Sequence, residues 1–154
     1  MNHLLNEDMV IRLFLAVLAG TVMGYPHARY IKSATRIYAI VCLGSALVML
    51  VSTWGFADLT PWINFDPARL SAQVIAGMGF VGAGIIIIRQ GRVYGLPASA
   101  TLWLTASIGL VIGLGWYFMA ILAVFASWGT FLVYPLMKKL LRLRRRKARE
   151  LRGE

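Results

Sequence analysis

The chain has 154 residues, of which 59% are hydrophobic and only 14% are charged. A soluble domain carries about 25% charged residues, so this composition excludes an ordinary water-soluble enzyme. The net charge of +10 is also found in nucleic-acid binders, but nine of the 16 Lys and Arg residues lie between Lys138 and Arg152. The basic character therefore belongs to a terminal segment, and we expect no nucleic-acid partner.

Apolar segments that approach the length needed to cross a bilayer, about 20 residues, recur along the sequence. They predict an all-α membrane protein with a bundle of about five transmembrane helices, over residues 9–25, 37–54, 70–88, 96–114 and 116–137. Residues 1–8 lack the positive charge that begins a cleaved signal peptide, so we expect the first segment to remain as an anchor. Gly113-Leu114-Gly115 predicts a tight helical hairpin between the last two segments. A segment that re-enters the membrane without crossing it is the alternative.

The charged residues predict the orientation of this bundle. If residues 1–8 lie outside and the tail of residues 138–154 lies inside, 14 of the 16 basic residues are cytoplasmic. Four of the six acidic residues, Glu7, Asp8, Asp58 and Asp66, are then outside. Because Lys and Arg concentrate on cytoplasmic loops, we expect a multi-pass inner-membrane protein with an outer N-terminus and a cytoplasmic C-terminus.

Small residues recur at helical spacing in three of the segments. Lipid is as apolar as leucine, so helices in a membrane associate through close packing of small residues. The third segment contains a G-x-G-x-x-G pattern, but a dinucleotide site needs that pattern between a strand and a helix, whereas here it lies inside an apolar span. We expect a compact bundle with the third helix near its centre. The predicted packing glycines are Gly20, Gly24, Gly77, Gly79, Gly82, Gly84, Gly109 and Gly113.

Polar side chains near the helices form a candidate functional site. Asp66 precedes Pro67 and can cap the third helix, and it can pair with Arg69 one turn on. Ionisable groups at membrane depth are often functional, so capping and a functional role both stay open. Thr101 and Thr105 can bond backward to helix carbonyls or line a polar pathway. The candidate set is Asp66, Arg69, Gln73, Arg12, Thr101 and Thr105.

The basic tail predicts attraction to anionic lipid, worth about 1 kcal/mol per basic residue near the surface. A protein partner and RNA are the alternatives for this segment. Its leading basic residues are Lys138, Lys139, Arg142, Arg144, Arg145 and Arg146. The single Cys42 and two isolated His residues suggest no catalytic set, metal site or cofactor, so we expect a protein that is not an enzyme.

Several motifs in order resemble the membrane domain of the MgtC/SapB family. They are Arg12-Leu-Phe-Leu-Ala, Asp66-Pro-Ala-Arg69-Leu-Ser-Ala-Gln73, Gly77-Met-Gly-Phe-Val-Gly-Ala-Gly84 and Ala100-Thr-Leu-Trp-Leu-Thr-Ala-Ser-Ile-Gly109. The resemblance covers residues 10 to 130. Where the family has a Gly-Leu-Glu-Arg-Glu type sequence, this chain reads Gly24-Tyr-Pro-His-Ala-Arg29, and the usual Gly-Leu-Thr-Thr-Ala-Ala is Gly95-Leu-Pro-Ala-Ser-Ala100. We therefore expect a divergent, short member of the family, with altered cytoplasmic loops.

The resemblance implies a bacterial inner-membrane protein tied to growth under magnesium limitation, in a family with members that act in virulence and restrain the membrane ATP synthase. It suggests a regulator or adaptor that contacts another membrane protein or itself. The magnesium link comes from the resemblance alone. A small oligomeric transporter or channel for an ion or polar solute, lined by the candidate polar set, is the alternative.

Overall fold

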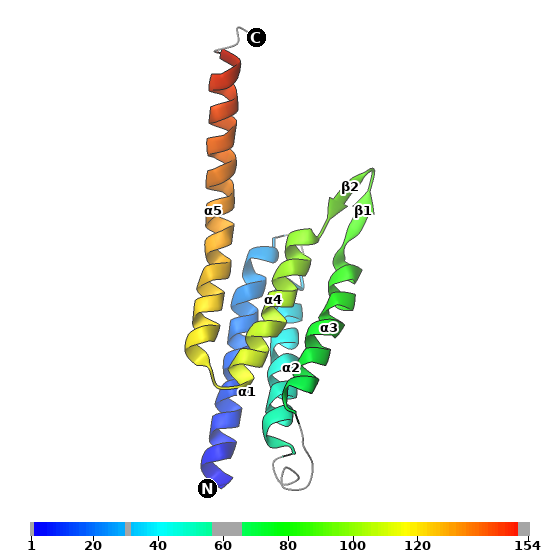
Figure 1. The fold of residues 1–154 in the computed structure, drawn as a ribbon, viewed down its shortest axis with the longest axis vertical. Coiled ribbons are helices and arrows are strands. Elements are labelled where there is room, and N and C mark those ends of the chain that lie inside the picture. The colour runs from blue at the N-terminus through cyan, green and yellow to red at the C-terminus, as the bar shows by residue number, and fades with distance from the viewer. Residues whose placement is uncertain (1, 30–31, 57–65, 151–154) are drawn as a thin grey trace.

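The computed structural model describes residues 2–29, 32–56 and 66–150, with the side chains of residues 2–6, 134–136 and 138–150 excepted. Five α-helices make up this part of the chain, as the sequence predicts (Figure 1). They are α1 (Asn2–Gly24), α2 (Ala34–Trp54), α3 (Ala68–Ile85), α4 (Leu96–Gly113) and α5 (Tyr117–Glu150). A short 3-10 helix, η1 (Tyr25–His27), follows α1.

Four of these helices are long and apolar enough to cross a membrane: α1, α2, α3 and α4. Each of α3 and α4 has 18 residues, which at 1.5 Å per residue gives about 27 Å, close to the hydrocarbon thickness of a bilayer. α5 contributes a shorter apolar stretch, Tyr117–Val133. Several apolar helices of this length indicate a membrane protein, because helices satisfy every backbone hydrogen bond within their own segment, as lipid requires.

The core lies between α1, α2 and α4, which pack closely on one another. Tyr38, Cys42 and Ala46 on α2 meet Leu102 and Ala106 on α4, and all five are buried. At the cytoplasm-facing end of the predicted topology, the Tyr38 hydroxyl donates a 2.7 Å hydrogen bond to the carbonyl oxygen of Ala98. This bond ties the starts of α2 and α4 together inside the core.

α3 lies at the edge of the bundle, so the expectation of a central third helix is wrong (Figure 1). It packs on α4 and less extensively on α2, and its buried residues are Met78 and Gly82. Except for Gly82, the small residues of α3 that suggested a central position face outward instead. Small residues indicate that a close contact is possible, but they do not say which partner makes it.

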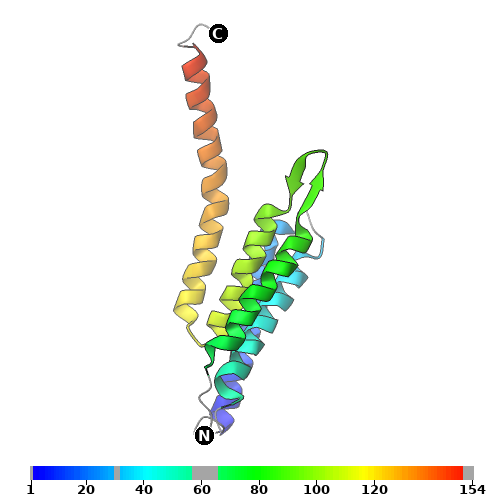
Figure 2. The same cartoon turned by 45° about the vertical axis from the view of Figure 1, so that its right-hand side comes forward.

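A β-hairpin replaces the end of the predicted third span, which was expected to continue to Ile88. α3 ends at Ile85, and β1 (Ile87–Arg89) pairs antiparallel with β2 (Arg92–Tyr94). Gln90 and Gly91 turn the chain with positive φ angles of 49° and 72°. The hairpin projects from the end of α3 beyond the bundle (Figure 2).

α4 and α5 are joined by a tight turn at Gly115, which has a φ angle of 84°. α5 starts beside the end of α4 and then diverges from α4 (Figure 2). Its 34 residues span about 51 Å, so it is longer than a bilayer core is thick. The basic segment from Lys138 onward continues α5 as a helix to Glu150.

Candidate functional site

Arg12 does not point toward Asp66 but reaches the end of α4. Its guanidinium donates a 2.8 Å hydrogen bond to the carbonyl oxygen of Gly113 and lies 3.7 Å from the Asp8 carboxylate. The side chain is only 14% exposed, and its Nε has no hydrogen-bond partner among the described residues. A positive charge here satisfies a terminal carbonyl and opposes the negative end of the helix dipole. Arg12 therefore has a clear structural role.

Asp66 precedes Pro67, the N-cap residue of α3, and its side chain bonds to the first N–H of the helix. Its Oδ1 accepts a 2.9 Å hydrogen bond from the backbone N–H of Ala68, and its own carbonyl accepts one from the N–H of Arg69. Nearby, the Ser52 hydroxyl donates to the carbonyl of Pro67 and fixes this corner to α2. Asp66, Arg69 and Gln73 are all exposed. The local geometry favours the capping role for Asp66.

Thr101 and Thr105 are buried in α4 and use their hydroxyls within the helix. Thr101 donates 2.8 Å to the carbonyl of Pro97, and Thr105 donates 2.8 Å to the carbonyl of Thr101. They lie toward the middle of α4, whereas Arg12 is bonded to its last residue, Gly113. The structure thus distributes the six candidate polar residues over the bundle and does not assemble them into one site.

The predicted packing glycines divide into two groups. A Cβ at Gly20 would lie 2.6 Å from Cα of Ala39, and one at Gly113 would lie 2.7 Å from the carbonyl oxygen of Ala46. Gly24, Gly82 and Gly109 have comparably close neighbours. Gly77, Gly79 and Gly84 meet nothing within 4 Å in the described part of the chain. Glycines therefore allow the close approach of α1 to α2 and of α2 to α4, whereas most glycines of α3 have no close neighbour in the described chain.

The open side of α3 forms a continuous apolar surface, which we call the α3 face. Its residues are exposed and mostly small, and they recur at intervals of three or four positions. Phe80, at 85% exposure, is the most exposed of its large side chains. The α3 face consists of Ala72, Gln73, Ala76, Gly77, Phe80, Ala83 and Gly84. Its spacing was visible in the sequence, but its outward orientation was not.

His27 joins α5 to the rest of the bundle, a role that its isolation in the sequence did not reveal. Its ring stacks on Tyr38 at 5.3 Å and meets the Phe131 ring edge-on at 5.4 Å. One turn away, Tyr25 stacks on Trp128 with ring centroids 6.4 Å apart. These aromatic contacts hold α5 at a point well beyond its first turn.

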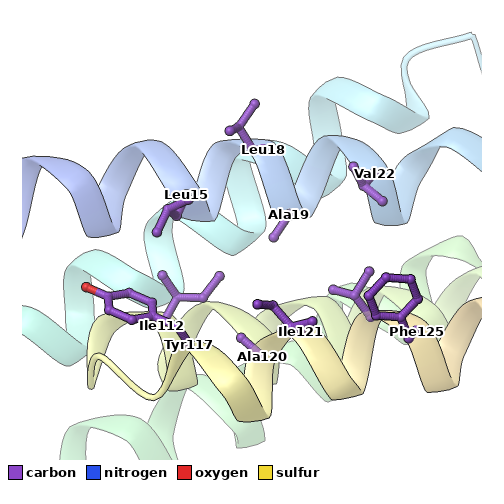
Figure 3. A pocket seen from close by; sticks show the side chains of 10 residues that line it. Leu15, Leu18, Ala19, Val22, Ile112, Tyr117, Ala120, Ile121 and Phe125 are labelled. Carbon is purple, nitrogen blue, oxygen red and sulfur yellow. The ribbon is translucent and has the colours of Figure 1, made fainter.

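An apolar groove of about 240 Å³ lies between α1, α4 and α5, and nothing in the sequence pattern indicates it (Figure 3). Ala19 and Val22 on α1 face Ile121 and Phe125 on α5 across this space. A second, shallower pocket lies between α3 and the Leu110 region of α4. Neither this groove nor this pocket is lined by any of the six candidate polar residues.

Some predicted features cannot be placed. Asp58 lies outside the described residues, as do the side chains of the basic tail residues Lys138, Lys139, Arg142, Arg144, Arg145 and Arg146. Among the residues that are described, no three His, Cys, Asp or Glu side chains lie together as a metal-binding group.

Comparison with known proteins places residues 13–140 on the model of the MgtC family. The chain is 41% identical over 120 residues to the "Putative magnesium transporter YhiD" of Escherichia coli K12, which covers 76% of this chain and 56% of that protein. It is 35% identical over 123 residues to Protein MgtC of Salmonella typhimurium LT2, covering 79% of this chain and 50% of the relative. Protein SrpB of Synechococcus elongatus is 36% identical over 123 residues, covering 74% and 68%. The match thus spans about half the length of YhiD and MgtC, and no solved structure matches.

Proposed function

We propose that this chain, which belongs to the MgtC family, is a multi-pass inner-membrane regulator or adaptor that helps cells adapt to magnesium limitation. It acts through helix–helix contact with another membrane protein and carries out no chemical reaction itself. The magnesium link rests on the family and on the name of the relative YhiD. The chain is embedded in the bilayer. Because Lys and Arg concentrate on the cytoplasmic side, the basic end of α5 lies in the cytoplasm.

The α3 face is the observation that supports this mode of action. Within a membrane, close approach of small residues stabilises helix pairs, and the α1–α2 and α2–α4 pairs of this bundle use their glycines in that way. α3 carries the same residue types but leaves Gly77 and Gly84 without a neighbour within 4 Å in the described chain. Gln73 adds an exposed amide to this otherwise apolar face, and in lipid an amide gains from a hydrogen-bond partner. A partner helix on this face would satisfy both.

A growth experiment tests the proposal. A strain that lacks the gene is grown in limiting magnesium and complemented with the wild-type chain, with Gly77→Leu or with Gly44→Leu. Gly44 on α2 is a matched control because it is also exposed, and a Cβ there would likewise meet nothing within 4 Å among the described residues. We expect the wild type and Gly44→Leu to restore growth and Gly77→Leu to fail at equal membrane abundance. Equal rescue by all three chains would overturn the role of the α3 face, and normal growth of the deletion strain would overturn the magnesium role.

The alternative function, a small transporter or channel, requires the candidate polar residues to line a common route. Arg12 instead bonds to the Gly113 carbonyl at the end of α4, and Thr101 and Thr105 bond to carbonyls within α4. Flux measurements separate the two functions, because liposomes that contain only this chain should be no more permeable to Mg²⁺ than empty liposomes. Protein-dependent flux that saturates with solute concentration would favour the transporter.

A further inference from the structure

We propose that the groove between α1, α4 and α5 is a binding site for one acyl chain of a membrane phospholipid. Its wall is made of aliphatic and aromatic side chains from three helices (Figure 3). The lining includes Leu15, Ala19, Val22, Ile112, Ile121 and Phe125. Such a wall offers no set of hydrogen-bond partners for water, which needs two to four of them.

The groove has room for an apolar ligand. At about 240 Å³ its volume exceeds that of an engineered apolar cavity of roughly 150 Å³ that binds benzene in another protein. Side chains around an unfilled space lose dispersion contacts on one side. Val22, Ile121 and Phe125 at its rim are 43%, 53% and 71% exposed, so the groove opens toward the surroundings of the bundle. Those surroundings are hydrocarbon, which identifies the occupant as a lipid chain.

The length and the ends of the groove fit a chain from one leaflet. The lining on α5 extends from Tyr117 to Phe125, about 12 Å along the helix, and half of a bilayer core is about 15 Å thick. Trp116 and Tyr117 stand at one end, where aromatic residues match the level of lipid headgroups. At the other end, one turn beyond Phe125, the Tyr25–Trp128 stack brings η1 and α5 together. The lipid therefore enters from the leaflet at the Gly115 end and fills the space between α1 and the first turns of α5.

Photolabelling of the full chain in vesicles tests this site. The vesicles contain phosphatidylethanolamine and phosphatidylglycerol, with a trace of phosphatidylcholine that carries a diazirine midway along one acyl chain. After irradiation, adducts are mapped by mass spectrometry. We expect them to concentrate on residues 15–22 and 117–125, well above the level on exposed Phe80 of α3.

Three variants separate a bound chain from bulk lipid. Ala19→Phe places a ring in the groove and should lower labelling there about tenfold, since that space cannot hold two groups. Ala126→Phe adds the same ring on an exposed position of α5 outside the lining and should leave labelling unchanged. Ile121→Ala widens the groove at an exposed position and should keep labelling at or above the wild-type level. Labelling that is uniform over all exposed faces, or equal in Ala19→Phe and Ala126→Phe, would overturn the proposal. So would an unlabelled groove, as expected if α5 or a second protein fills it.

Discussion

The guanidinium of Arg12 donates a hydrogen bond to the carbonyl oxygen of Gly113, and so joins α1 to the end of α4 across 101 positions of sequence. It also lies over the Gly115 turn, where a Cβ would come within 3.0 Å of Arg12 Nη2. One side chain therefore holds together three features: the middle of α1, the end of α4 and the turn that directs α5. These contacts explain why a charged residue, Arg12, is present in the first membrane segment.

Arg12→Leu should destabilise the bundle, because it leaves the Gly113 carbonyl without its side-chain donor in a site that is mostly shielded from water. We expect a loss of about 1.5–3 kcal/mol, the range for hydrogen bonds to charged groups. Arg12→Lys keeps the charge and should lose less. Thermal unfolding of the purified chain in detergent measures both, and equal stability of Arg12→Leu and wild type would refute the assigned role.

Gly109→Ala should destabilise the α2–α4 contact, because the added methyl group would overlap the Cys42 carbonyl oxygen and lie 2.8 Å from Cβ of Ser45. Overpacking of this kind costs about 1–3 kcal/mol. Gly77→Ala adds the same group in open space and removes a helix-destabilising glycine, so its effect should be neutral or slightly stabilising. The two melting temperatures in the same detergent give the comparison. A loss of similar size in both variants would mean that the α3 glycines pack within this chain.

Tyr38→Phe removes the 2.7 Å bond to the Ala98 carbonyl while preserving the ring that stacks on His27. We expect a loss of about 0.5–1.5 kcal/mol, the usual contribution of a neutral hydrogen bond. Tyr38→Ala should cost considerably more, because it also empties a fully enclosed part of the core. If Tyr38→Phe and Tyr38→Ala lose the same free energy of unfolding, the ring is not the main stabilising part of Tyr38.

Asp66→Asn should behave like the wild type in stability and in growth, because an amide oxygen can accept the Ala68 N–H bond as well as a carboxylate can. Asp66→Ala should lose about 1 kcal/mol through the missing cap. The pair decides between the two roles that the sequence left open. If Asp66→Asn is stable but fails to complement growth in limiting magnesium, the carboxylate itself is functional.

The helical architecture could be predicted from the sequence because hydrophobic length is a strong signal in a membrane protein. The five helical segments follow from this hydrophobic length, and the turn at Gly115 follows from the glycines between the last two segments. The β-hairpin was missed because Ile85 to Ile88 is a run of four apolar β-branched residues. Such a run suits a helix inside the bilayer and equally a strand outside it. The turn at Gln90-Gly91 is the feature that favours the strand.

The candidate site was less predictable, because helical spacing gives the residues of a face but not its orientation. Gly109 and Gly77 look alike in the sequence, yet one is enclosed by α2 and the other faces outward. The groove needed even more information, since it depends on how α5 is placed beside α1. The aromatic contacts of His27 and Tyr25 that help fix this placement join residues about 100 positions apart.

The measurement that tests the central claim most directly is site-specific crosslinking in native membranes at Phe80. A photoreactive phenylalanine analogue replaces Phe80 on the α3 face or, as a control, Phe14 on α1, which is also well exposed. We predict that irradiation at Phe80 joins the chain to a specific membrane protein or to a second copy, and that irradiation at Phe14 gives no adduct of protein size. The absence of any protein adduct at Phe80, in cells grown with limiting magnesium, would contradict the account.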